Sequence, residues 1–187
     1  MTHSLRRPAP LLLAVAVLVT LVAALLPALP ARAATPSPKW EQAQVGLDYS
    51  VYAPTQTLGL KMKSFKLLDC AAPGLDEQIA AQYGSVNGRG FEIFESQNNC
   101  EDGPAPVALV ATFSVDGALA RVFVLCPGSY WSCKKIGTAG LKKYGGYTEV
   151  ILPAGSSLLQ PTLVTLWSTR LTLTDIKKVT RGLTFAG

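Results

Sequence analysis

Few side chains in this chain are suited to catalysis or metal binding. The only histidine is His3. Four cysteines follow much later, at Cys70, Cys100, Cys126 and Cys133. Acidic residues number 12. Any catalytic site must therefore use carboxylates, thiols, hydroxyls or lysines unless His3 stays in the functional protein.

The first 33 residues have the organisation of a cleavable signal peptide. Arg6 and Arg7 precede an apolar run over residues 11–26, and the small-residue motif Ala-Arg-Ala ends the segment at Ala33. This order predicts general secretion with cleavage after Ala33, outside the cell or at the exterior of the envelope. An uncleaved anchor is the alternative, because the apolar stretch approaches the ~20 residues of a membrane span. Only then do we expect membrane contact.

Removal of this segment changes both the charge and the available chemistry. Three of the 17 Lys and Arg residues leave with it and none of the 12 acids does, so the net charge falls from +5 to 14 − 12 = +2. Without His3, the mature chain cannot use Ser-His-Asp or Cys-His catalysis. Short lysine pairs are typical of a solvated face, so we expect no nucleic-acid partner. No phosphate-binding loop is present, and we expect no cofactor and no metal.

An even number of cysteines in an exported domain predicts two disulfides. Three connectivities are possible, and we favour Cys70 with Cys100 and Cys126 with Cys133. The first bridge would clamp the base of a hairpin, and the second would close an eight-residue loop. A zinc site is the alternative, but the cysteine spacings contain no Cys-x₂-Cys pair.

One hairpin is predicted around Asn87-Gly88, a pair that supplies two positive-φ residues for a type I′ turn. It joins strands over residues 77–84 and 90–97. Alternation along the second strand places Glu92 and Glu95 on opposite faces, so these two carboxylates should not converge. Further strands are expected at residues 50–53, 58–68, 147–152 and 162–168.

A second hairpin is predicted at Asp116-Gly117. Because the turn has two residues, Val115 lies opposite Ala118. Strand alternation then places one set of side chains from both strands on a single core face. That face contains Val107, Leu109, Ala111, Phe113, Val115, Ala118, Ala120, Val122, Val124 and Cys126, with Leu109 opposite Val124 and Val107 opposite Cys126. The other face carries Phe123 and Leu125 beside polar residues and should be partly wet.

A helix is predicted near the end of the chain. Thr172 and Asp175 form a capping box, and Gly182 ends the helix. Ile176 and Val179 share its apolar face. The segment at residues 137–146 is expected to be a flexible loop.

Together these signals predict an α+β fold with two disulfides. Its main element is a twisted, mostly antiparallel β-sheet, half-barrel-like, with the C-terminal helix packed on it. We expect an N-terminal linker at residues 34–47 and one domain over residues 48–187.

Several stretches resemble a bacterial extracytoplasmic domain of unknown function. Residues 50–60 read Ser-Val-Tyr-Ala-Pro-Thr-Gln-Thr-Leu-Gly-Leu, and the likeness continues at residues 82–96 and 163–183. The family's Leu-Pro is missing at residues 56–58, and the four cysteines are a further departure. The resemblance implies a fold akin to the half-barrel of LolA-like lipoprotein carriers and a binding or sensing module of unknown ligand. It supplies no catalytic residues.

The first functional hypothesis is a secreted, non-catalytic binding domain of the cell envelope. A lipid-like ligand would occupy a pocket between the sheet residues Phe123 and Leu125 and the helix residues Ile176 and Val179.

Two other hypotheses remain open. The first is a protein-interaction module or inhibitor, which would use Tyr130 and Trp131 in the loop between Cys126 and Cys133, because large amphipathic rings are common interface anchors. The second is a hydrolase that uses carboxylates alone. Its candidate acids are Glu92, Glu95, Glu101 and Asp102.

Overall fold

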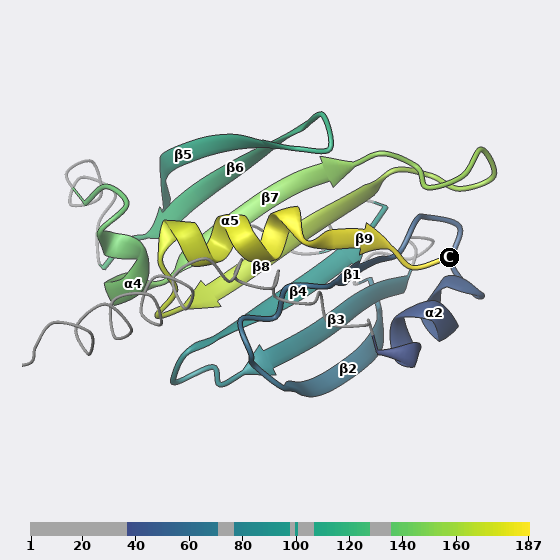
Figure 1. Ribbon diagram of the computed structural model, residues 1–187, viewed down its shortest axis with the longest axis horizontal. Coiled ribbons are helices and arrows are strands. Elements are labelled where there is room, and N and C mark those ends of the chain that lie inside the picture. The colour runs from purple at the N-terminus through teal and green to yellow at the C-terminus, as the bar shows by residue number, and fades with distance from the viewer. Residues whose placement is uncertain (1–36, 71–76, 98–99, 101–106, 128–135) are drawn as a thin grey trace, which may run out of the picture. The chain divides into compact units, whose positions relative to one another are not determined.

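Strands form most of the fold (Figure 1). The computed structural model describes residues 37–70, 77–97, 100, 107–127 and 136–187. Within these residues, seven strands form one antiparallel sheet in the order β2-β3-β4-β8-β7-β6-β5. Their bounds are β2 Met62–Asp69, β3 Glu77–Gly84, β4 Gly90–Ser96, β5 Val107–Val115, β6 Ala118–Leu125, β7 Gly146–Leu152 and β8 Thr162–Thr169.

The remaining elements in the described part of the chain are a short ribbon and three helices. Strand β1, Tyr52–Pro54, pairs with β9, Leu183–Phe185, in a separate two-stranded sheet. The helices are α2 Pro38–Gln44, α4 Gly140–Tyr144 and α5 Leu173–Arg181. The predicted α+β class, with a mostly antiparallel sheet and a C-terminal helix, is confirmed.

One face of the large sheet is covered and contributes the core. Figure 1 shows α5 and the β1–β9 ribbon lying across this face. Buried side chains from both layers form one cluster there, because the burial of apolar surface is favourable. Its fully or almost fully buried members include Val51, Ile79, Ile93, Val122, Val124, Leu166, Leu171, Ile176, Val179 and Leu183. We call this the covered face and the opposite one the outer face.

Helix α5 begins where the sequence predicts. The Thr172 hydroxyl accepts a hydrogen bond from the Asp175 backbone N–H at 3.2 Å, and the Asp175 carboxylate accepts from the Thr172 N–H at 3.1 Å. Both bonds satisfy N–H groups that the first helical turn leaves unpaired. Leu171 and Ile176, on either side of the cap, are fully buried and fix the helix against the core.

The β5–β6 hairpin forms as predicted near its turn and differs at its open end. Asp116 and Gly117 have φ of 47° and 84°, as a type I′ turn requires. Val115 pairs with Ala118, but a register shift between Leu109 and Ala111 changes the later pairs. The predicted partners Val124 for Leu109 and Cys126 for Val107 are therefore wrong. Leu109 pairs with Phe123 and is 54% exposed, because the bulge turns it to the outer face.

The β3–β4 hairpin is also present, but its turn differs from the prediction. The strands close at the pair Gly84 and Gly90, which leaves a five-residue loop from Ser85 to Arg89. Asn87 and Gly88 do not take positive φ; Gly84 does, at 74°. The ladder therefore ends before the Asn-Gly pair, and a turn in which the Gly88 N–H bonds to the Ser85 carbonyl forms within the loop.

Two segments predicted to lack structure are helical. Helix α2 lies within the predicted linker at 34–47, and its Trp40 is fully buried. The Trp40 indole N–H donates to the Tyr83 hydroxyl at 3.1 Å, and its ring meets Phe65 edge-on at 5.0 Å. Helix α4 lies in the predicted flexible loop at 137–146, with Leu141 fully buried. In both cases a large apolar side chain docks the segment onto the core.

The predicted disulfide between Cys70 and Cys100 is present, with Cα atoms 5.1 Å apart. It follows β2 and links this strand's end to the segment after β4. Cys133 lies outside the described residues, so the second bridge, with Cys126, stays a prediction.

The burial of Trp40 generates a stability prediction. Trp40→Ala should lower the free energy of unfolding by about 3 to 5 kcal/mol, because it leaves a cavity and an unpaired Tyr83 hydroxyl. Chemical denaturation measures this loss.

The matched control is Val45→Ala, at the end of the same helix, where the side chain is 90% exposed. This variant should stay within about 0.5 kcal/mol of the parent. An equally small loss of stability in Trp40→Ala would mean that residues 34–47 are a linker, as the sequence predicts.

Candidate functional site

The structure does not assemble the predicted pocket. Ile176 and Val179 are fully buried on the covered face, in the same cluster as Val122. Phe123 and Leu125 lie on the outer face, because their side chains alternate along β6 with those that enter the core. The prediction that these four residues line one cavity is therefore wrong. Buried side chains occupy the space between α5 and the sheet.

The outer face carries a row of neighbouring side chains that crosses six strands. Ring centroids of Trp167 and Tyr147 lie 5.5 Å apart, and those of Tyr147 and Phe123 lie 6.0 Å apart. Tyr147 is buried, whereas Leu109 at the end of the row is exposed. We call this set the aromatic row. From β3 to β5 it consists of Gln82, Glu92, Trp167, Tyr147, Phe123 and Leu109.

Strands β6 and β7 separate next to this row. Their ladder has four pairs, of which Arg121 with Glu149 is the outermost. Strand β6 begins three residues earlier, at Ala118, and β7 continues three residues further, to Leu152. These two end segments face each other without pairing. Figure 1 accordingly shows the tip of the β5–β6 hairpin standing apart from β7.

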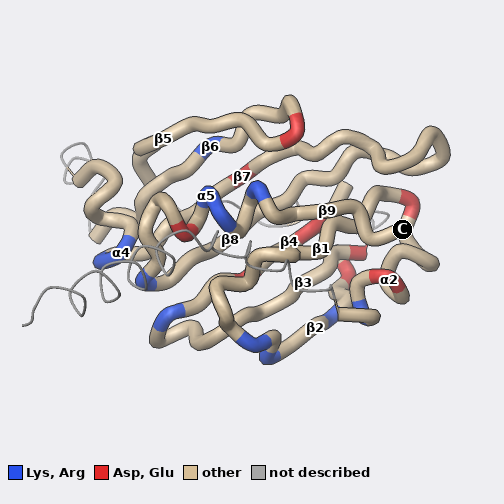
Figure 2. Tube along the Cα trace, viewed as in Figure 1, with Lys and Arg blue, Asp and Glu red and all other residues tan. Residues whose placement is uncertain are grey.

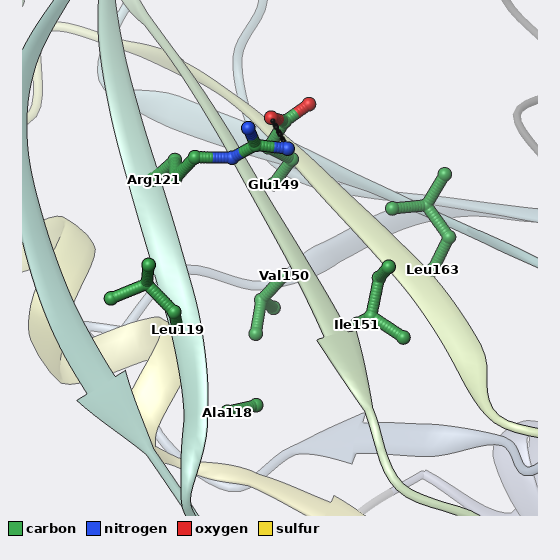
Figure 3. Close-up of a pocket in the computed structure, with 7 residues that line it drawn as sticks. All are labelled: Ala118, Leu119, Arg121, Glu149, Val150, Ile151 and Leu163. Carbon is green, nitrogen blue, oxygen red and sulfur yellow. Dashed lines mark ion pairs between the residues drawn. The ribbon is translucent and has the colours of Figure 1, made fainter.

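The separation leaves an open cavity of about 340 Å³, which we call the β6–β7 cleft. Figure 3 shows Leu119 on one wall and Ile151 and Leu163 on the other. Leu119 and Ile151 are each 63% exposed. Large aliphatic side chains that stay in water on neighbouring strands are typical of a surface that a partner covers. The complete lining is Ala118, Leu119, Arg121, Glu149, Val150, Ile151 and Leu163.

One ion pair closes the end of the cleft where the ladder begins (Figure 3). The Arg121 guanidinium lies 2.6 Å from the Glu149 carboxylate, and the two side chains are 55% and 22% exposed. An exposed pair of this kind contributes at most about 1 kcal/mol to stability. Its main effect is to place a donor and an acceptor beside the apolar walls.

Charge is otherwise sparse around the cleft. Strands β5 and β8 contain no charged residue, and β6 and β7 contain one each, the two members of this pair. Figure 2 shows the basic residues gathered instead on α4, α5 and the β2–β4 side of the sheet. The cleft therefore suits an occupant that is mostly apolar.

The two candidate carboxylates that the structure describes, Glu92 and Glu95, do not converge. Glu92 lies on the outer face and Glu95 on the covered face, as strand alternation predicts. Glu101 and Asp102 lie outside the described residues.

Glu95 is nevertheless unusual, because its side chain is fully buried. One carboxylate oxygen accepts the Tyr52 backbone N–H at 3.0 Å, and the other has no hydrogen-bond partner among the described residues. Burial raises the pKa of Glu95 well above its usual range, and the Tyr52 bond only partly opposes this. The nearby Glu95 carboxyl also helps to raise the pKa of Tyr83 to about 12, after burial as the larger cause. Glu95 does not line the β6–β7 cleft, and its hydrogen bond to Tyr52 lies on the covered face.

The sequence analysis named Glu95 only as a candidate acid and missed its burial, although the signal was present. Phe91 and Ile93 are core residues, and Glu95 is the next residue on the same face of β4. Tyr130 and Trp131, the predicted interface anchors, lie outside the described residues.

No family model, curated protein or solved structure matches this chain. The likeness to the LolA-like half-barrel stays an expectation. Within the described part of the chain, which starts at Ser37, no helix is long and apolar enough to cross a membrane.

The buried Glu95 carboxyl predicts a distinctive pH dependence of stability. The raised pKa means that the folded state keeps a proton which the unfolded state releases above about pH 4.3. The stability that depends on this proton is present at lower pH and is lost as the pH rises through the folded-state pKa. Relative to Glu95→Gln, the unfolding free energy of the parent should fall by up to about 1.4 kcal/mol per pH unit.

Denaturant titrations of both proteins between pH 4 and 8 measure this difference. Glu41→Gln, which removes an exposed carboxylate from α2, is the control and should follow the parent. If the difference in unfolding free energy between the parent and Glu95→Gln stays constant from pH 4 to 8, Glu95 is ionised in the folded protein and the prediction is wrong.

Proposed function

We propose that this chain is an exported, non-catalytic binding domain that holds an extended, mostly apolar polypeptide segment in the β6–β7 cleft. The observation that carries the proposal is the separation of β6 and β7 beyond the pair Arg121 and Glu149. This separation leaves two strand edges and an apolar surface open together.

The main chain supports a polypeptide occupant. Residues 118–120 of β6 pair with β5, and residues 150–152 of β7 pair with β8, so each segment keeps its other edge toward the cleft. An extended peptide can bond to such an edge and use its side chains for specificity. A lipid chain would leave those main-chain groups without partners.

The side chains support the same occupant. Leu119 and Ile151 provide apolar contacts on opposite walls, and Arg121 and Glu149 provide polar contacts at the closed end. This combination of an apolar centre and a polar end is typical of specific interfaces.

The proposed location follows from the N-terminal segment. A signal peptide over residues 1–33 would deliver the domain outside the cell or to the exterior of its envelope. The Cys70–Cys100 disulfide is consistent with an oxidising compartment. The absence of histidine after His3 supports a binding role over most hydrolytic ones.

Selection from a displayed peptide library tests the proposal. The purified chain should select extended, mostly apolar peptides, and fluorescence anisotropy then gives their affinity. The double variant Leu119→Thr, Ile151→Thr should bind them at least about tenfold more weakly, because two apolar contacts are lost. Threonine keeps the strand preference, so the fold should persist.

Leu158→Thr is the matched control, since Leu158 is 91% exposed and lies outside the cleft. It should bind the selected peptides like the parent. Equal binding by the double variant would contradict the proposed site. If mass spectrometry finds a co-purified lipid that only the double variant loses, the occupant is lipid-like and the polypeptide proposal is wrong.

A further inference from the structure

A second cavity opens on the outer face, at the opposite end of the aromatic row from Leu109. It has a volume of about 200 Å³ and lies between the β3–β4 loop and β8. The side chains that carry its chemistry are an amide, a carboxylate, an indole and two hydroxyls. They belong to Gln82, Glu92, Trp167, Ser85 and Thr169.

The sheet register holds three of these side chains next to one another. Gln82 pairs with Glu92, and Glu92 pairs with Trp167. Side chains at directly paired positions on one face have Cβ atoms about 4.5–5.5 Å apart. An indole ring, a carboxylate and an amide therefore stand side by side on three rigid strands.

These polar groups are free to bind a ligand. Among the hydrogen bonds and ion pairs of the described residues, none involves the side chains of Gln82, Glu92, Ser85 or Thr169 or the indole N–H of Trp167. Glu92 is half-buried, and burial raises the pKa of its carboxyl while Lys66 opposes the shift. A half-buried carboxylate without a bonded donor can accept hydrogen bonds from a ligand.

We propose that this cavity is a subsite for one neutral sugar ring. Adjacent hydroxyls of a sugar would donate to the Glu92 carboxylate and the Gln82 carbonyl, and the Gln82 amide N–H would donate to a hydroxyl oxygen. The apolar face of the ring would pack against the indole, which is a large, flat apolar surface. A few converging polar groups around an apolar platform are the usual features of a small-molecule site.

The same groups fit an organic cation less well. The positive charge of Lys66 already acts on Glu92, which weakens the attraction for a second cation. The hydroxyls and the amide N–H donors would also have no role with a ligand that offers no acceptor.

Nuclear magnetic resonance of the full chain tests the subsite. Trp167→Phe identifies the Trp167 indole N–H signal by its loss. Glucose, galactose, mannose and N-acetylglucosamine are then titrated singly to about 100 mM, because one ring with few contacts binds weakly. At least one of these sugars should shift the Trp167 signal in a saturable way.

The variant Glu92→Gln should weaken this binding about tenfold or more, because a hydrogen bond to a charged acceptor is lost. Glu77→Gln, an exposed carboxylate on β3, is the matched control and should bind like the parent. If Glu92→Gln loses its dispersed spectrum, Gln82→Ala tests the neighbouring contact and should also weaken binding.

Two outcomes would overturn the proposal. One is the absence of any Trp167 shift with all four sugars. The other is that tetramethylammonium shifts the Trp167 signal in a saturable way, that Glu92→Gln abolishes this shift, and that none of the four sugars shifts the signal.

Discussion

The central constraint on this fold is that a β-sheet has two faces, and that the described helix α5 and the β1–β9 ribbon lie across one of them (Figure 1). Alternation sends Val122 into the core and Phe123 to the opposite side of the same strand. Helix α5 and the β1–β9 ribbon remove the covered face from water, which supplies the main stabilising free energy. The outer face keeps exposed Leu119 and Ile151. Those side chains do little for folding, which is why we connect them with binding.

The covered face also contains a group that is costly to bury, the Glu95 carboxyl. Its bond to the Tyr52 N–H joins strand β1 to strand β4. The Tyr49 hydroxyl adds a second link, shared between the carbonyl oxygens of Glu77 and Glu95 at 2.9 and 3.0 Å. These contacts fix the ribbon on the sheet. The buried Glu95 therefore helps to hold the core together. Both proposed binding sites lie on the other face of the sheet.

Local signals were sufficient to predict several elements. The Asp116-Gly117 turn and the Thr172–Asp175 capping box depend on residues close in sequence, and both formed as expected. Alternation correctly separated Glu92 from Glu95. The error about Phe123 and Leu125 came from placing the helix against the wrong face of β6.

The features that define the proposed sites depend on contacts between distant segments. The bulge near Leu109 interrupts the β5–β6 ladder, and the loss of pairing beyond Arg121 is set by how β6 meets β7, which follows it only after helix α4. Helix α2 was missed because it is short and is fixed by Trp40 against Tyr83, 43 residues away. No local sequence pattern predicts these contacts between separate segments.

The central claim is that the outer face is the surface that meets a partner. Hydroxyl-radical labelling of intact producing cells, compared with the purified chain, tests it most directly. Leu119 and Ile151 should be labelled less on the cells than in the purified protein, while the more exposed Val45 and Leu158 should be labelled alike in both. Equal labelling of Leu119 and Ile151 in the two samples would contradict the claim.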